Sequence, residues 1–359
     1  MRYSPKHFLP SIRSTVAVAA CLVGVVSLMQ AVPAARAETV RYSDHDALGG
    51  MRTDFVREVW LPEIAKQSND AITVRDYFGG TLLGPKEVLK GLGDGIVKLA
   101  YIYPGHHPDQ LIAHSIFPLL PRGPARFENM VWFYRQLYER VPAFREELAR
   151  ANWEPLMLTA GLPGAFAATY PAKSMKDLQG KKWRASGNWP LRYLGNVGAT
   201  PVSIPWDDLY ISLQTGTVEG VYTNYDGIHM AKLDEVASNI LLSKALWFAT
   251  PMVHGANKPW FDALPAEQQD AIRAASQEAE RRFAEVYDQT FEKIRADQIA
   301  AGYSVVELTD EDVALWENAE KLPELQQTWV TEAEAAGLKN AAEVMEQVRA
   351  IHAEAMQRP

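Results

Sequence analysis

The sequence predicts an α/β protein of about two domains. From Thr39 onward, short runs rich in β-branched and aromatic residues alternate with helical runs, which is typical of α/β architectures. The 359 residues are 47% hydrophobic and 22% charged, ordinary values for a globular protein, and such a length predicts about two domains. One helical run is also too long for a single small domain.

The expected strands are short and evenly spread. They fall at residues 39–43, 72–77, 99–103, 155–159, 165–170, 182–185, 200–204, 220–223 and 252–256, with a further strand-like run at 305–308. The segment 161–164 is rich in turn residues, so we expect the chain to leave one lobe and enter the other there.

Helical periodicity predicts helices at 51–67, 86–92, 127–151, 206–214, 266–300, 310–322, 323–336 and 341–357. The helix at 266–300 has Pro265 before its first turn and Gly302 just beyond its end, both typical boundary residues. At 1.5 Å per residue it would be about 50 Å long. We therefore expect this helix to cross two lobes.

Residues 1–37 have the pattern of a secretory signal peptide. Three basic residues precede an apolar run at 15–32, and Ala35-Arg36-Ala37 supplies a small-x-small cleavage site. We expect cleavage after Ala37, and therefore a periplasmic protein. Two alternatives are a lipobox ending at Cys21 and a retained membrane anchor, since the apolar run is close to the roughly 17 residues that a span needs.

The charge and cysteine content exclude several classes of protein. The formal charge is -8, and removal of Arg2, Lys6, Arg13 and Arg36 with the leader takes it to -12. An acidic protein lacks the basic patch that nucleic acids require. Cys21 is the single cysteine, so the exported chain would have no disulfide, thiolate zinc site or catalytic thiol.

Four motifs occur in a fixed order between residues 180 and 220. They are Gly180-Lys181-x-x-Arg184, Gly198-Ala199-x-Pro201-Val202, Asp208-x-Tyr210-x-x-Leu213-Gln214 and Thr215-Gly216-x-Val218-Glu219-Gly220. Together they resemble the solute-binding proteins of tripartite ATP-independent periplasmic (TRAP) transporters, the dicarboxylate-binding P-component family. The resemblance covers essentially all of the exported chain, with Glu219 where the family usually has Asp.

The resemblance implies a two-lobed clamshell with a long helix spanning both lobes. Lobe I would comprise residues 38–161 and about 250–289; lobe II would comprise 162–249 and about 290–359, including the C-terminal helices. The implied function is the capture of an organic acid and its delivery to the membrane permease subunits. A binding protein of an ABC-type importer or of a sensor kinase is the alternative.

The resemblance also assigns ligand-binding residues. Its carboxylate-binding arginine matches Arg184, whose guanidinium can grip a carboxylate with two parallel hydrogen bonds. Its polar partner matches Asn224, and the flanking aromatics match Trp206 and Tyr103. Core packing is the competing interpretation of the two aromatics. Further candidates near the cleft are Asp44, Trp189, Tyr222 and Trp247.

The strand at 164–170 contains no arginine, whereas sialic-acid-binding members of the family carry one there. A second ligand carboxylate would thus be buried without a matching cation, which costs several kcal/mol. We expect a monocarboxylate with an apolar, possibly aromatic, remainder, unless an unplaced group such as His45 or Lys98 supplies the charge.

No catalytic motif is present. The sequence lacks His-Glu-x-x-His and Gly-x-Ser-x-Gly, so we expect neither an enzyme nor a cofactor. Asp44-His45-Asp46 and His106-His107-x-Asp109 are the two segments with metal-ligand residue types. We expect the first to face the cleft and contact the ligand, with a cation contact as the alternative, the second to be a loop, and the protein to be a monomer.

Overall fold

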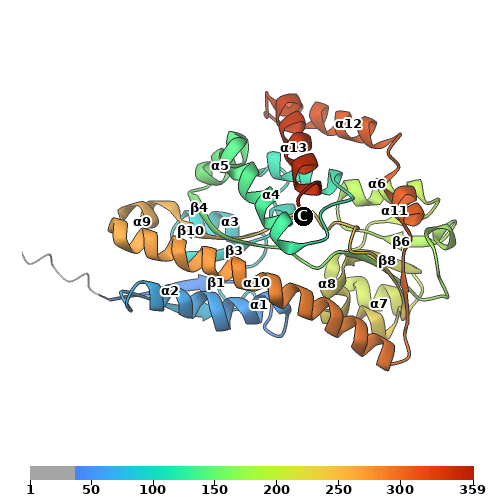
Figure 1. The fold of residues 1–359 in the computed structure, drawn as a ribbon, viewed down its shortest axis with the longest axis horizontal. Coiled ribbons are helices and arrows are strands. Elements are labelled where there is room, and N and C mark those ends of the chain that lie inside the picture. The colour runs from blue at the N-terminus through green and yellow to red at the C-terminus, as the bar shows by residue number, and fades with distance from the viewer. Residues whose placement is uncertain (1–36) are drawn as a thin grey trace, which may run out of the picture. The chain divides into compact units, whose positions relative to one another are not determined.

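The computed structural model describes residues 37–359, which form one compact unit containing two β-sheets (Figure 1). The signal peptide and its alternatives fall almost wholly on residues 1–36, outside the described part. The first sheet has the order β2-β1-β3-β10-β4. Its strands are β1 (Glu38–Ser43), β2 (Ile72–Tyr77), β3 (Leu99–Ile102), β4 (Trp153–Thr159) and β10 (Met252–Asn257).

The second sheet has the order β11-β9-β5-β8-β6-β7. Its strands are β5 (Gly164–Ala168), β6 (Lys182–Arg184), β7 (Thr200–Val202), β8 (Gly220–Asn224), β9 (Asn239–Leu242) and β11 (Ser304–Glu307). The chain passes from the first sheet to the second between β4 and β5, and returns between β9 and β10. Strands β6 and β8 are parallel neighbours, so their carboxyl ends meet at one edge of the sheet.

The helices cover the faces of the two sheets. Their bounds are α1 (Met51–Phe55), α2 (Leu61–Gln67), α3 (Val88–Gly93), α4 (Phe127–Arg140), α5 (Pro142–Arg150), α6 (Asn188–Asn196), α7 (Leu209–Gln214), α8 (Tyr225–Met230), α9 (Lys258–Ala263), α10 (Ala266–Ala300), α11 (Asp310–Glu317), α12 (Leu322–Ala335) and α13 (Ala341–Met356). A π-helical turn, Val56–Trp60, joins α1 to α2. Within residues 37–359 no helix is long and apolar enough to cross a bilayer.

Helix α10 crosses from one sheet to the other, as its length predicts (Figure 1). Its first half packs against α2, α4 and β4, and its second half packs against α8 and β11. Its buried residues extend from Gln268 to Gln298. Both the two-sheet α/β fold and the spanning helix are therefore confirmed.

One predicted helix is wrong. The sequence predicts a single helix at 127–151, but the structure has α4 and α5 with a break at Val141. Pro142 has no backbone N–H to donate, and its ring disfavours helical geometry at the preceding residue. The apolar periodicity continues across this break, which is why periodicity alone does not reveal it.

Several short elements were not predicted. Strand β9 and helices α6, α8 and α9 are each nine residues or shorter, so the periodic signal within them is weak. The C-terminal helices pack on widely separated parts of the chain: α11 on α6, α12 on the 3-10 helix Ala113–Leu119, and α13 on α4. The division of the chain into lobes at the expected boundaries remains a prediction.

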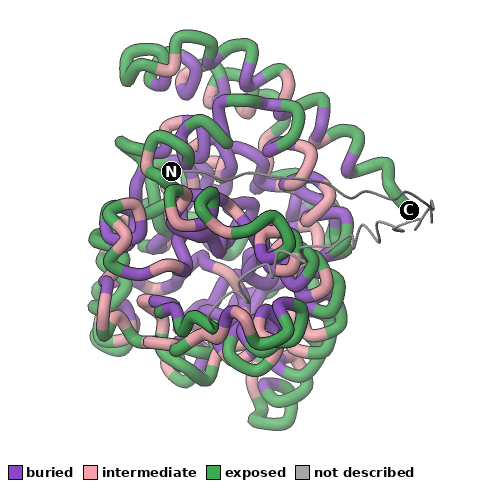
Figure 2. Tube along the Cα trace, turned by 90° about the vertical axis from the view of Figure 1, so that its left-hand side faces the viewer, coloured by how far each residue is buried: buried purple, intermediate pink, exposed green. Residues whose placement is uncertain are grey.

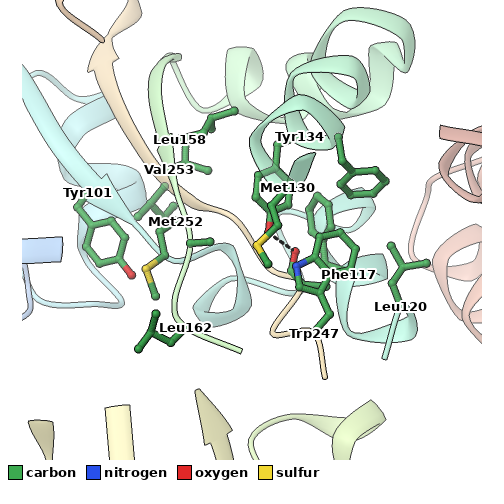
Figure 3. Packing of buried hydrophobic residues seen from close by; sticks show 14 of the residues in the cluster. Tyr101, Phe117, Leu120, Met130, Tyr134, Leu158, Leu162, Trp247, Met252 and Val253 are labelled. Atoms are coloured by element: carbon green, nitrogen blue, oxygen red, sulfur yellow. Dashed lines mark hydrogen bonds between the residues drawn. The ribbon is translucent and has the colours of Figure 1, made fainter. Parts of the chain in front are cut away.

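A continuous apolar core lies beneath these elements. Figure 2 shows the buried segments gathered toward the interior of the molecule and the exposed segments along its outside. Trp247 belongs to the same buried cluster as Phe117 and Tyr134 (Figure 3). Tyr134 stacks on Trp247 with 6.0 Å between ring centroids and packs edge-on against Phe117.

A buried ion pair ties α10 to α4 and β4. The Glu280 carboxylate accepts a hydrogen bond from the Leu158 backbone N–H at 2.6 Å and is paired with Arg135, whose Nε lies 3.2 Å away. Arg135 also donates to the Leu156 carbonyl at 2.7 Å. Burial raises the pKa of Glu280 above its usual range. The pair therefore compensates a carboxylate that would otherwise be costly at this position.

We predict that Arg135→Met lowers the free energy of unfolding by about 2 to 4 kcal/mol, because it leaves Glu280 buried without its cation. The matched control is Arg281→Met on the same helix as Glu280, which removes only an exposed pair with Glu278 and should cost less than about 1 kcal/mol. Urea denaturation measures both. Equal effects of the two substitutions would contradict the prediction.

Candidate ligand-binding site

Arg184 is a buried cation without a counter-ion. It ends β6, which is paired with β8 and β7 on its two sides, and it is 4% exposed. Its Nε donates to the Ile204 carbonyl at 3.1 Å, while Nη1 is buried without a hydrogen-bond partner. Within residues 37–359 no carboxylate forms an ion pair with it, and burial lowers its pKa to about 10. Such a guanidinium is suited to an external anion.

Two predicted aromatic residues lie close to this guanidinium. Trp206 opens the 3-10 helix Trp206–Asp208 and has its ring centroid 5.7 Å from the Arg184 Cζ atom. It is 38% exposed, so it is not a core residue. Tyr103 follows β3 in the first sheet; burial raises its pKa to about 12, and the Arg184 charge opposes that rise. Arg184 and Tyr103 thus approach each other from different sheets.

A small cavity of about 30 Å³ adjoins these residues. Three predicted residues, Tyr103, Tyr222 and Trp247, line it. The other lining residues come from segments far apart in the sequence: Pro118, Pro121, Ser186, Pro190, Tyr193, Phe248, Ala249, Thr250 and Trp316. This volume is enough for about two water molecules. A larger solute therefore requires the surrounding elements to move apart.

Trp189 lies beside the cavity rather than on its wall. It is buried near the start of α6, with the Arg192 guanidinium 4.7 Å from its ring centroid. Its neighbour Pro190 lines the cavity. Its role as a ligand contact remains a prediction.

Asn224 lies at the carboxyl end of β8, the same edge of the sheet as Arg184. Its amide oxygen accepts from the Thr223 hydroxyl at 3.0 Å, and its amide nitrogen donates to Asp226 at 2.7 Å. Asp226 also accepts from the Leu162 backbone N–H at 2.8 Å. These bonds orient the Asn224 amide and leave one of its two N–H groups for another acceptor.

Asp44 lies in a separate, fully buried network. Its carboxylate accepts hydrogen bonds from both Nη atoms of Arg52 at 2.5 and 3.0 Å, from Tyr42 at 2.7 Å and from the Asp46 backbone N–H at 3.0 Å. It does not line the cavity. The structure therefore places Trp206 beside Arg184 and puts Tyr103, Tyr222 and Trp247 on the wall of one cavity, whereas the Asp44 carboxylate is already paired with Arg52.

Three of the groups that could have supplied a second positive charge are neutralised or uncharged. Arg52 is paired with Asp44 and Asp46. Burial lowers the pKa of His45, and it lowers that of His106 to about 4. Lys98 lies at the start of β3, where its backbone N–H donates to Arg41 at 3.2 Å. Among residues 37–359 no three His, Cys, Asp or Glu side chains gather closely enough to hold a metal ion.

The sequence did not single out Tyr193, Phe248 or Trp316 as site residues. Tyr193 and Trp316 lie on α6 and α11, whereas Phe248 follows Trp247 in the return segment before β10. Only Phe248 has a local sequence signal, because it directly follows Trp247, a predicted ligand contact. Pairing of α6 with α11 is a tertiary contact without a sequence signature.

Comparison with known proteins identifies one family. Residues 52–331 match the model of "Bacterial extracellular solute-binding protein, family 7". The ectoine-binding periplasmic protein TeaA of Halomonas elongata is 24% identical over 81% of this chain and 86% of its own. The ectoine/5-hydroxyectoine-binding periplasmic protein UehA of Ruegeria pomeroyi is 26% identical over 87% of this chain and 85% of its own.

Solved structures agree on the fold. A TRAP solute-binding protein from a marine metagenome, specific for aromatic acid ligands and crystallised with 3-hydroxybenzoate, superposes with a TM-score of 0.75 at 20% identity. The alignment covers 89% of this chain and 99% of that one. The chain therefore belongs to bacterial extracellular solute-binding protein family 7, the family of TRAP transporter solute-binding proteins.

Proposed function

We propose that this protein captures an organic monocarboxylate in the periplasm and delivers it to the membrane permease of a TRAP transporter. The observation that carries the proposal is the buried, unpaired guanidinium of Arg184. A ligand carboxylate at Arg184 would restore the missing charge compensation through two parallel hydrogen bonds. Asn224 would donate its free N–H to the same group or to a neighbouring ligand atom.

The remainder of the ligand would be apolar and carry no second carboxylate. Tyr103, Tyr222 and Trp247 line the cavity, and aromatic rings of this kind favour an apolar or aromatic body. No lysine, arginine or histidine is among the lining residues. One solved relative is specific for aromatic acid ligands and was crystallised with 3-hydroxybenzoate, a monocarboxylate on an aromatic ring, which supports this class.

The proposal includes export and cleavage after Ala37, which the basic, apolar and small-x-small segments of the leader support. We further propose that the exported protein acts as a monomer and does not bind nucleic acid, in keeping with its acidic charge. Mass spectrometry of the periplasmic protein would identify Glu38 as its first residue.

Substitution of Arg184 tests the proposal directly. Arg184→Ala should cost about 2 to 5 kcal/mol of binding free energy, because a buried ligand carboxylate loses its partner. Affinity would fall about 30-fold or more. Arg184→Lys should bind with intermediate affinity, since it keeps the charge and loses the bidentate geometry.

The matched control is Arg192→Ala, which removes an exposed cation that is paired with Glu332. It should change affinity less than threefold. Calorimetric titration with the acid selected from a thermal-shift screen measures all three variants. A less than threefold loss for Arg184→Ala would remove this residue from the site.

Competition binding tests the ligand class. Benzoate-like and branched monocarboxylates should displace a bound ligand better than succinate, malate or sialic acid. A second carboxylate would lose its hydration without gaining a cation, whereas a ring would bury apolar area worth about 25 cal/mol per Å². The opposite order would demonstrate a second cation in the pocket.

The affinity should be independent of pH between 6 and 9. Arg184 keeps its proton across this range, because its pKa is lowered only to about 10, and His106 stays neutral because its pKa is lowered to about 4. Burial also lowers the pKa of His45. Titration at constant ionic strength measures the dependence. A tenfold gain in affinity at pH 6 would show that a histidine supplies positive charge to the ligand.

A further inference from the structure

Three side chains on the cavity wall carry buried polar atoms without a partner. They are the hydroxyl of Tyr193, the indole Nε1 of Trp247 and the indole Nε1 of Trp316. The three residues are at most 3% exposed. A buried donor that lacks a partner costs about 1 to 3 kcal/mol. The described chain supplies no partner for these three atoms, so a bound group or water must provide one.

These residues come from three separate parts of the chain. Tyr193 lies on α6, Trp316 on α11, and Trp247 in the segment between β9 and β10. The ring centroids of Tyr193 and Trp316 are 5.4 Å apart. Trp316 is also 4.7 Å from the ring of Tyr222, which lines the same cavity. We call Tyr193, Trp247 and Trp316 the distal donors.

The chemistry of the distal donors limits what they can bind. An indole N–H only donates, and a tyrosine hydroxyl can do so. The complementary group is therefore a hydrogen-bond acceptor. Because no Lys, Arg or His lines the cavity, an anionic acceptor would be buried without compensation. A neutral oxygen, such as a carbonyl, hydroxyl or ether, meets both conditions.

The cavity also adjoins the carboxylate site. Ser186, two residues after Arg184, lines it, as does Tyr103, whose pKa responds to the Arg184 charge. A small acid bound to Arg184 would thus extend toward the distal donors. We propose that they form a second subsite, which selects organic acids bearing a neutral oxygen acceptor on the end remote from the carboxylate. This inference rests on the proposed function of Arg184.

Matched pairs of ligands test the subsite. The probes are benzoate with 3- and 4-hydroxybenzoate, and cyclohexanecarboxylate with 4-oxocyclohexanecarboxylate. In at least one pair the oxygenated acid should bind at least threefold more tightly in calorimetric titration, the gain expected of one added hydrogen bond. Parent acids that bind as tightly as their oxygenated partners would overturn the proposal, as would failure of every probe to bind.

Variants that retain the ring separate this subsite from the carboxylate site. Tyr193→Phe, Trp247→Phe and Trp316→Phe each remove one donor. At least one of them should abolish the preference for the oxygenated acid, measured as the ratio of the two affinities, so that a loss common to both acids of the pair cancels. The control is Trp153→Phe, which removes an indole bonded to the Leu89 carbonyl at 2.9 Å, away from the cavity, and should keep the preference intact.

The outcomes distinguish the two proposals. Arg184→Ala should lower the affinity for both acids of a pair by the same factor. Unchanged affinity for both acids would contradict the proposed role of Arg184, whereas the preference between the two acids tests the distal donors. If all three phenylalanine variants keep the preference, the distal donors bond only to water and the subsite proposal is wrong. Tighter binding of glycine betaine than of any oxygenated acid would show that the aromatic rings select a cation, which also overturns it.

Discussion

The site depends on one unbalanced charge, the buried guanidinium of Arg184. Burying a cation without a partner is unfavourable in the free protein, and the sheet, the Ile204 carbonyl and the ring of Trp206 together hold it in place. The protein can retain such a group because the rest of the fold is well packed. In the proposed function, a ligand carboxylate would compensate the charge of Arg184 and gain affinity by doing so.

A second buried arginine, Arg52, lies in α1. Arg52 is as deeply buried as Arg184, but Asp44 and Asp46 neutralise it and its guanidinium lies 3.5 Å from the centroid of the Tyr101 ring. That network fixes the segment after β1. The two arginines show that the same residue type can be buried with its charge compensated by the chain, as at Arg52, or without a counter-ion from the described residues, as at Arg184.

The cavity beside Arg184 has walls from both sheets and from the C-terminal helices. Tyr103 follows a strand of the first sheet, Tyr222 lies on a strand of the second, and Trp316 is carried by α11. Behind Trp247, His352 of α13 stacks on the indole with 5.6 Å between ring centroids. The C-terminal helices therefore do more than cover the surface, since they complete and support the wall of the site.

The sequence by itself determined the α/β class, most strands to within two residues, and both ends of α10, because periodicity and boundary residues are local signals. It also pointed to Arg184, Trp206 and Asn224 as candidate ligand contacts through motifs that lie close together in the chain, and their role remains a prediction. It could not reveal the break at Val141 from periodicity, nor the short β9.

Only the tertiary structure decided which buried polar groups already have a hydrogen-bond or ion-pair partner within the chain. Asp44 looked available in the sequence, but Arg52, eight residues later, occupies its carboxylate. Tyr193 and Trp316 looked like ordinary helix residues, yet their helices pack together around the cavity. Whether a buried group has a partner depends on contacts between segments distant in sequence, and no local pattern encodes those contacts.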